Sequence, residues 1–307
     1  MKSPFVEAVE YRCFALLCGL ARLLSFRMAG RVGGFLGRLG YFIIVARKRV
    51  ALDNLAHAFH EMPVGQRRGI ARAAFRNYGI ALVEMLWAGG QSADELMKTA
   101  RLSNPEVVEK HLGHSAGLII LSAHFGGWEL IIHPVRLHLG RPFVIIVQRQ
   151  RNRRIDAMID ASRAKWNNKT VPMGVSSREA FRALREGNIV AMLGDQSGPK
   201  EAVFIEFFGR PAATHRGAAA FSLKTGAPIV MLFLVRQNDG TYEAVFEEVS
   251  KSGIEDYTEE NVIELTRRHT ALLERYIRGH PDHWLWMHKR WKHTEFYQSH
   301  ETIAPEA

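Results

Sequence analysis

One short segment carries the residue types that acyl transfer to a hydroxyl requires. It reads His124-Phe125-Gly126-Gly127-Trp128-Glu129 and follows an apolar run at 117–123. Such a reaction, with a thioester as donor, needs a base and a group that orients the base. The two glycines permit a tight turn, so the imidazole can fold back over a helix that Trp128 and Glu129 open. We predict that one ring nitrogen of His124 bonds to Glu129 and that the other accepts a hydroxyl proton.

This pairing depends on where the helix begins. Within one continuous helix, residues 124 and 129 would point about 140° apart, because a helix has about 3.6 residues per turn. The two side chains meet only if His124 precedes the helix, at the carboxyl end of a strand, where open α/β sheets place their sites. Backbone amides of the turn could then stabilise an oxyanion. The same pattern also fits a structural arrangement in which His124 caps the helix and Glu129 is exposed.

The elements that would hold this segment follow from the pattern after residue 92. Short β-rich runs alternate with helical segments, which predicts an α/β fold with a mostly parallel central sheet flanked by helices. The predicted strands are 117–123, 142–148, 170–173, 188–193 and 228–235, with an antiparallel strand at 241–249. The predicted helices are 128–139, 154–166, 177–186, 216–225 and 258–278.

Residues 1–92 differ from the rest in charge and in pattern. They hold thirteen Lys or Arg against five Asp or Glu, a net +8 out of the chain's formal +10. We predict a basic helical N-terminal region at 1–92, an acyltransferase-type α/β domain at 93–300 that is continuous with it, and a loose tail at 301–307. Such a basic region needs an anionic partner. Its aromatic residues lie among Leu, Ile and Gly, which favours a lipid surface over nucleic-acid bases.

The N-terminal region is not predicted to contain a full membrane span. Its best apolar run, at 13–26, includes Arg22 and is shorter than the roughly 20 residues that cross a bilayer. No small-residue cleavage site follows the run, so a cleaved signal peptide is not predicted either. We predict a helix that lies in the membrane interface; a buried helix and a tilted span are the alternatives.

Disulfide and metal chemistry are not predicted. The chain has only two cysteines, Cys13 and Cys18, both in the apolar N-terminal stretch, which favours a reducing compartment. The histidines between 280 and 293 have spacings that fit no tetrahedral zinc site. We therefore predict a site without a metal or another cofactor.

Five segments, in order along the chain, resemble the late acyltransferases of lipid A biosynthesis, which are similar to the wider glycerolipid acyltransferases. Residues 124–129 are similar to the family's His-x4-Glu/Asp motif. The other segments are Arg49…Asn54-Leu55 with Phe59, Gly194-Asp195-Gln196 with Gly198-Pro199, residues 207–214 and residues 280–292. The resemblance covers nearly the whole chain. The chain departs from the family's Asp-Gln-Asp stretch at Ser197, which stands where the second acid is common.

The resemblance implies an O-acyltransferase that moves a fatty acyl chain from acyl carrier protein to a hydroxyl of a lipid A precursor. It implies His124 as general base, Glu129 as the carboxylate that orients it, and Arg163 as a catalytic arginine that neutralises negative charge. The implied partners are acyl carrier protein, a membrane glycolipid and the cytoplasmic face of the bacterial inner membrane, but no nucleic acid. The predicted substrate-binding residues are Arg149, Asn152, Asp195, Gln196 and Arg290.

Two alternatives stay open at this point. A related enzyme would acylate another phospholipid or glycolipid by the same chemistry. A non-catalytic membrane-binding protein would use the same positive charge without needing the pair at His124 and Glu129.

Overall fold

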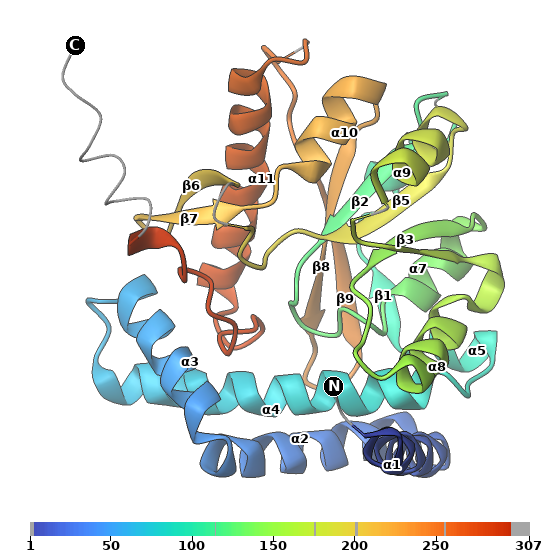
Figure 1. The fold of residues 1–307 in the computed structure, drawn as a ribbon, viewed down its shortest axis with the longest axis vertical. Coiled ribbons are helices and arrows are strands. Elements are labelled where there is room, and N and C mark those ends of the chain that lie inside the picture. The colour runs from blue at the N-terminus through green and yellow to red at the C-terminus, as the bar shows by residue number, and fades with distance from the viewer. Residues whose placement is uncertain (1–2, 114, 175, 200–201, 255, 296–307) are drawn as a thin grey trace.

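A computed structural model of the chain describes residues 3–113, 115–174, 176–199, 202–254 and 256–295. The predicted tail at 301–307 lies outside these residues. The central sheet is built from β1 (Ala100–Leu102), β2 (Leu118–Ser122), β3 (Phe143–Val147), β4 (Lys169–Pro172), β5 (Ile189–Leu193), β8 (Ile229–Arg236) and β9 (Tyr242–Glu248). Their order is β1-β9-β8-β2-β5-β3-β4 (Figure 1). Every neighbouring pair is parallel except β8 with β9, so the predicted mostly parallel sheet is confirmed.

Helices cover both faces of this sheet, which is why β2 reads as an unbroken apolar run. On one face, Leu118 and Ile120 join a core with α5 (Ala93–Met97) and α7 (Ile132–Leu139), and α6 (Glu106–Glu109) adds Val108. On the other face, Ile119 and Leu121 pack into the core of α9 (Ser176–Arg185), α10 (Gly217–Thr225) and α11 (Glu259–Gly279). The helix α8 (Arg153–Arg163) and the 3-10 turn η1 (Lys165–Asn167) precede β4.

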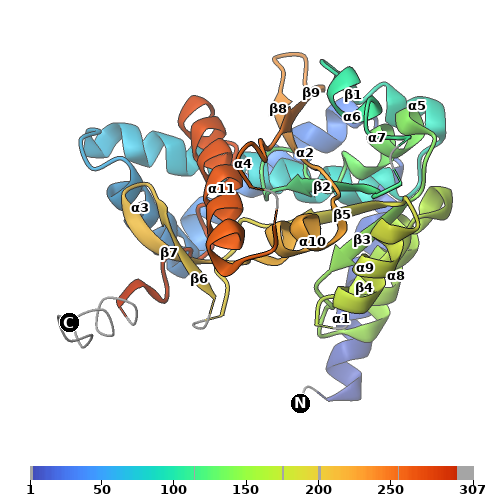
Figure 2. The ribbon, with the colours of Figure 1, turned by 90° about the horizontal axis from the view of Figure 1, so that it is seen from above.

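The N-terminal region forms the helices α1 (Pro4–Arg22), α2 (Phe26–Ile43), α3 (Val45–Ala58) and α4 (Val64–Ala88), which come before α5. Figures 1 and 2 show α4 beside the sheet and α2 running along its outer side. Small residues allow this close packing: a Cβ on Gly33 would lie 2.6 Å from the Gly79 carbonyl oxygen, and one on Gly37 would lie 2.2 Å from that of Phe75. The helical N-terminal region is therefore as predicted.

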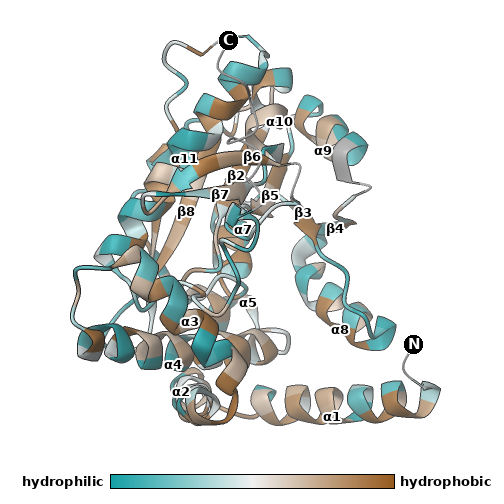
Figure 3. Ribbon diagram, turned by 60° about the vertical axis from the view of Figure 1, so that its left-hand side comes forward, coloured by the Kyte–Doolittle hydropathy of each residue, from teal (hydrophilic) through white to brown (hydrophobic). Residues whose placement is uncertain are grey.

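The outer surface of α1 and α2 carries many large apolar side chains beside its basic residues. Figure 3 shows α1 extending from the body of the protein toward α8, with hydrophobic residues along it. Among the described residues, no single helix has the length and hydropathy of a membrane span; α2 and α3 meet that test only together, with a 90° bend between them. The large side chains that stay exposed on this surface include Phe5, Leu16, Leu23, Phe35, Leu36 and Phe42.

Three features differ from the predicted elements. The strand β1 and the antiparallel hairpin of β6 (Val203–Phe207) with β7 (Arg210–Thr214) were not predicted. The hairpin turns through Phe208 and Gly209, which both have positive φ; glycine is typical there, but phenylalanine is not. The helix predicted from residue 128 begins only at Ile132, because the amides of Leu130 and Ile131 both donate to the Gly127 carbonyl in a preceding turn.

Candidate active site

The structure pairs His124 with Asp195. The neighbouring parallel strands β2 and β5 align Ser122 with Leu193, so the residues two positions beyond each strand lie side by side. The Nδ1 of His124 is 2.9 Å from Oδ1 of Asp195, and the backbone amide of His124 donates to Oδ2 at 3.1 Å. Trp284 donates its indole N–H to the same oxygen at 2.9 Å. The carboxylate is buried and fully engaged, so it fixes the ring and its tautomer.

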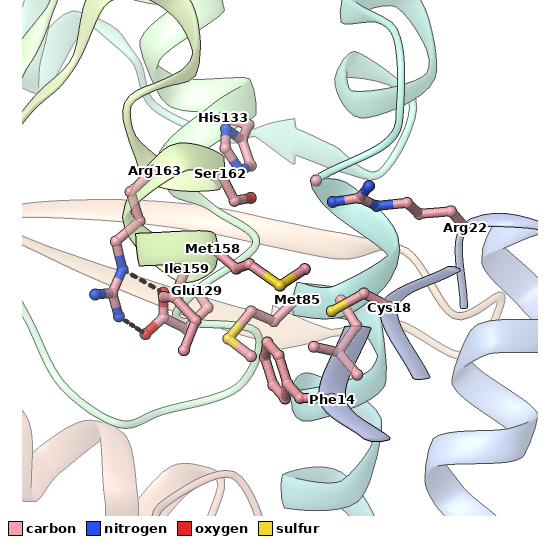
Figure 4. A pocket seen from close by; sticks show the side chains of 12 residues that line it. Phe14, Cys18, Arg22, Met85, Glu129, His133, Met158, Ile159, Ser162 and Arg163 are labelled. Atoms are coloured by element: carbon pink, nitrogen blue, oxygen red, sulfur yellow. Dashed lines mark hydrogen bonds and ion pairs between the residues drawn. The ribbon is translucent and has the colours of Figure 1, made fainter. Parts of the chain in front are cut away.

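The prediction that Glu129 accepts a hydrogen bond from His124 is wrong. The turn at 127–131 postpones the helix and directs Glu129 toward α8, where Arg163 donates to both carboxylate oxygens, with a distance of 3.1 Å from Nε to Oε2. Figure 4 shows this two-pronged ion pair at one side of a small pocket that residues of α1, α4 and α8 also line. Glu129 still lies close enough for its charge to act on the imidazole. The candidate site therefore holds two carboxylates with different partners.

Burial and charge act in opposite directions on the imidazole. Burial alone lowers the pKa of His124, but the charge and hydrogen bond of Asp195 outweigh it, with Glu129 adding to their effect. The resulting pKa of His124 lies above its ordinary value of 6.5. Burial alone would raise the pKa of Asp195. The charge and hydrogen bond of the imidazole outweigh burial, so the pKa of that carboxyl is lowered. The pair is thus arranged to accept and hold a proton on the ring.

The other histidines nearby are held neutral. Burial lowers the pKa of His288 to about 4, and its Nε2 accepts a hydrogen bond from the Ser197 amide at 3.1 Å. Burial also lowers the pKa of His215, with Arg290 and Lys292 adding to the effect. Of His124, His215 and His288, His124 is the one with a raised pKa. It is the candidate base of the site.

A cavity of about 570 Å³ opens beside His124 and runs between the sheet and α7. Its polar mouth holds His124, Glu129, Arg163, Gln196 and Lys292. The Nε2 of Gln196 lies 3.2 Å from Nε2 of His124, so this amide faces the ring nitrogen that is free of Asp195. The apolar part of the lining comes from residues that include Ile120, Ile131, Ile132, Val135, Phe143, Ile145 and Leu232. The cavity has the polarity that a fatty acyl chain with a reactive end requires.

Three predicted site residues hydrogen-bond to groups other than His124 and Asp195. Arg149 pairs with Asp156 and Asp160 at the surface. Asn152 caps α8 by accepting from the amides of residues 154 and 155, and it donates to the Glu7 carbonyl. Arg290 is buried and donates to the Ala213 carbonyl and the Thr214 hydroxyl. None of the three lines the cavity at His124, so their surroundings favour structural roles.

The hydrogen bond from Trp284 to Asp195 was not predicted. Trp284 lies in the segment at 280–292 that resembles the family's C-terminal signature, and that resemblance was the available signal. Within the described residues, no group of three or more His, Cys, Asp or Glu side chains could hold a metal ion.

A mostly parallel sheet flanked by helices, with a histidine–carboxylate pair beside a cavity that is lined in part by apolar side chains, defines the class: an α/β protein with the features of an enzyme site. A sequence profile of the bacterial lipid A biosynthesis acyltransferases matches residues 7–293. The chain belongs to this family.

Characterised relatives agree with that assignment at low identity. A lipid A biosynthesis acyltransferase of Haemophilus influenzae is 23% identical over 299 residues, which cover 94% of this chain and 93% of the relative. The lipid A biosynthesis lauroyltransferase of Escherichia coli is 23% identical, over 88% of this chain and 87% of its own length. The palmitoleoyltransferase of the same organism is 24% identical, over 85% and 84%.

Proposed function

We propose that this acyltransferase moves a fatty acyl chain from acyl carrier protein to a hydroxyl of a lipid A precursor. The observation that carries the proposal is the His124–Asp195 pair at the mouth of the apolar cavity, because it joins a base to a compartment for a fatty chain. The names of the two Escherichia coli relatives specify lauroyl and palmitoleoyl chains, which are apolar chains of the kind that this cavity would hold.

The reaction we propose transfers one proton twice. Nε2 of His124 takes the proton of the acceptor hydroxyl while the hydroxyl oxygen attacks the thioester carbonyl carbon. Asp195 stabilises the imidazolium and keeps Nδ1–H in place. The tetrahedral intermediate then collapses, the C–S bond breaks, and the imidazolium returns the proton to the leaving thiolate. The products are an ester and a free thiol, so atoms and charge balance.

Gln196, Glu129 and Arg163 would support this reaction from the cavity mouth. The Gln196 side-chain amide lies within hydrogen-bonding distance of Nε2 of His124. Once the acceptor hydroxyl takes its place at that nitrogen, the amide can donate to the oxygen that becomes negative. The Arg163–Glu129 ion pair places a guanidinium there as well, with its direction fixed by two hydrogen bonds. We assign Arg163 to charge stabilisation and Glu129 to holding Arg163 and raising the pKa of His124.

The N-terminal helices would bring the site to its lipid. The exposed apolar side chains of α1 and α2, together with the basic residues of this region, suit the interface of an anionic membrane. We place the protein at the cytoplasmic face of the bacterial inner membrane, where an acidic carrier protein can also reach the basic surface.

The proposal is tested by incubating the purified protein with acylated carrier protein and a lipid A precursor in detergent micelles. Mass spectrometry should find the precursor heavier by one ester-linked acyl group, with an equal amount of free carrier thiol. A glycerophospholipid offered as acceptor is the comparison. Acylation of that lipid alone would refute the acceptor assignment, and transfer to neither lipid would refute the enzymatic proposal.

Phe143 should limit the length of the acyl chain. It begins β3, four residues before Val147, and thus lies about 13 Å deeper along the strand, at about 3.3 Å per residue. For a chain two carbons longer than the one that the wild type prefers, Phe143→Ala should have a kcat/KM about tenfold above that of the wild type. The reason is that each buried CH₂ contributes ~0.8 kcal/mol. The measurement is competition between acyl carrier proteins that carry different chains.

The control for this substitution is Val144→Ala. Val144 is the next residue on β3, but its side chain joins the core on the opposite face of the sheet and does not line the cavity. Its preference should equal that of the wild type. An unchanged preference in Phe143→Ala would place the end of the acyl chain elsewhere.

A further inference from the structure

A second large cavity lies among arginines, apart from the cavity at His124. It has a volume of about 580 Å³ and is bounded by α2, α4, the turn that joins β8 to β9, and residues 282–283. The charged side chains that line it are Arg27, Arg31, Arg76, Arg236, Asp239 and Asp282. Four guanidinium groups therefore face two carboxylates, and neither the His124–Asp195 pair nor the acyl cavity uses them.

Most of this positive charge lacks a partner. Within the described part of the chain, Arg27, Arg31 and Arg76 form no ion pair, and Arg76 donates only to the side-chain oxygen of Asn77, at 3.0 Å. Burial lowers the pKa of Arg76, and the neighbouring charges of Arg236 and Arg38 lower it further; Asp282 and Tyr242 act in the opposite direction but do not outweigh them. Guanidinium groups that outnumber the carboxylates around them repel one another, so an anion between them would be stabilised.

The two carboxylates are already engaged by other groups. Asp282 accepts from the Asn77 amide at 3.0 Å and lies 2.8 Å from Nδ1 of His283. Asp239 accepts from the backbone amide and the hydroxyl of Thr241. Neither forms an ion pair with the cavity's arginines among the described residues, so the arginines keep donors for a ligand.

Arg236 gives the cavity a fixed wall. Its side chain is only 13% exposed, and Nη1 donates to buried Glu84 and to Tyr242, both at 2.7 Å. Its Nη2 faces Gly30: a Cβ at residue 30 would lie 2.7 Å from that nitrogen. The glycine therefore leaves the space that this guanidinium occupies, and the donor is held in place before any ligand arrives.

The cavity also borders the apolar surface of α2. Residues 27, 31 and 38 follow the helical spacing of four and seven, so they form one stripe along the helix. The exposed apolar residues Met28, Phe35 and Phe42 form the neighbouring stripe. If the apolar stripe enters a membrane, the arginines lie at the depth of the lipid headgroups. The backbone of His283 links the cavity to the catalytic turn, since its carbonyl accepts from the Gly126 amide at 2.9 Å.

We propose that this arginine cavity binds the phosphate group of a membrane lipid headgroup. Planar guanidinium groups match phosphate oxygens with paired hydrogen bonds. The phosphate can belong to the acceptor glycolipid or to the surrounding anionic phospholipid. The first case rests on the proposed function; the second does not.

The test compares two double variants of the full chain. Arg31→Gln with Arg76→Gln removes two cavity charges, and Arg68→Gln with Arg141→Gln removes two exposed charges outside it. One assay measures acylation of a phosphorylated glycolipid in neutral detergent micelles. The other measures binding, without acceptor, to vesicles of phosphatidylcholine alone or mixed with phosphatidylglycerol. Thermal unfolding of each variant establishes that it is folded, and Gly30→Ala, which displaces Arg236, provides an independent third variant.

If the acceptor supplies the phosphate, the cavity variant should raise KM for the acceptor by about tenfold or more, since each lost charge-assisted hydrogen bond is costly, with kcat within about twofold. If phospholipid supplies it, the same variant should lose about tenfold in binding to the anionic vesicles and keep its binding to neutral ones. Equal results for the cavity and control variants in both assays would overturn the proposal. Should no acceptor be acylated by the wild type, the proposed function fails, and the vesicle assay alone decides this inference.

Discussion

His124→Asn should lower kcat by about 10²–10⁴-fold, the range that a positioned general base contributes. The asparagine amide nitrogen can take the place of Nδ1 and keep the hydrogen bond to Asp195, while the variant lacks the Nε2 that faces Gln196. The buried carboxylate thus retains its partners, and the melting temperature should stay near that of the wild type. The measurement is single-turnover acyl transfer from acylated carrier protein, with thermal unfolding alongside.

His124→Ala provides the matched comparison. It removes the donor as well as the base, so Asp195 is left buried with only Trp284 and one backbone amide. The alanine variant should lose the same turnover and also lose stability, because a buried charge that loses a hydrogen-bond partner costs about 1–3 kcal/mol or more. Retained turnover in the asparagine variant would show that another group acts as the base.

Asp195→Asn should lower kcat by about 10²–10⁴-fold and shift the pH profile to lower pH. In the wild type, kcat/KM should rise with pH as His124 loses its proton, at a pKa above the ordinary 6.5. The charge of Asp195 raises that pKa, whereas burial lowers it. Without the charge the imidazolium is less stable, the pKa of His124 falls, and the acid limb moves toward lower pH. Turnover falls nevertheless, because the ring loses its fixed tautomer.

Glu129→Gln separates the roles of the two carboxylates. Glu129 acts on His124 only through its charge and is bonded to Arg163, so this variant should shift the acid limb in the same direction by less. The experiment records kcat/KM against pH for both variants at constant ionic strength. A larger shift in Glu129→Gln than in Asp195→Asn would mean that the carboxylates have the opposite roles.

Most strands of the sheet were predictable because they are short apolar runs bounded by turn residues, such as Gly117 before β2. The partner of His124 was not, since the interpretation sought a carboxylate near in sequence. The decisive fact is that β5 lies beside β2, and strand order is set by the packing of helices far along the chain. Asp195 was recognised as a site residue, but its place two positions beyond β5 gains meaning only from that adjacency.

The predictions of local structure were wrong where hydrogen bonds to the backbone determined the conformation. The Gly127 carbonyl takes two amides in a turn and so delays α7, which sends Glu129 to Arg163. The hairpin of β6 and β7 turns at Phe208 with a positive φ, which carries no sequence signal. Arg290 looked available to a substrate because it is charged, but the carbonyl of Ala213 and the hydroxyl of Thr214 hold it inside the protein.

The late position of Trp284 in the chain affects when the bonding of Asp195 is complete. Its indole completes the bonding of Asp195, and Asn54 of α3 holds the following backbone by donating to the carbonyls of Trp286 and His288. The helix α3 thus holds the segment that supplies the indole to the His124–Asp195 pair. During synthesis, a nascent chain on the ribosome carries the histidine and both carboxylates before Trp284 and the segment that follows it have been made. The bonding of Asp195 is therefore complete only after residue 284 has been synthesised and can reach β5.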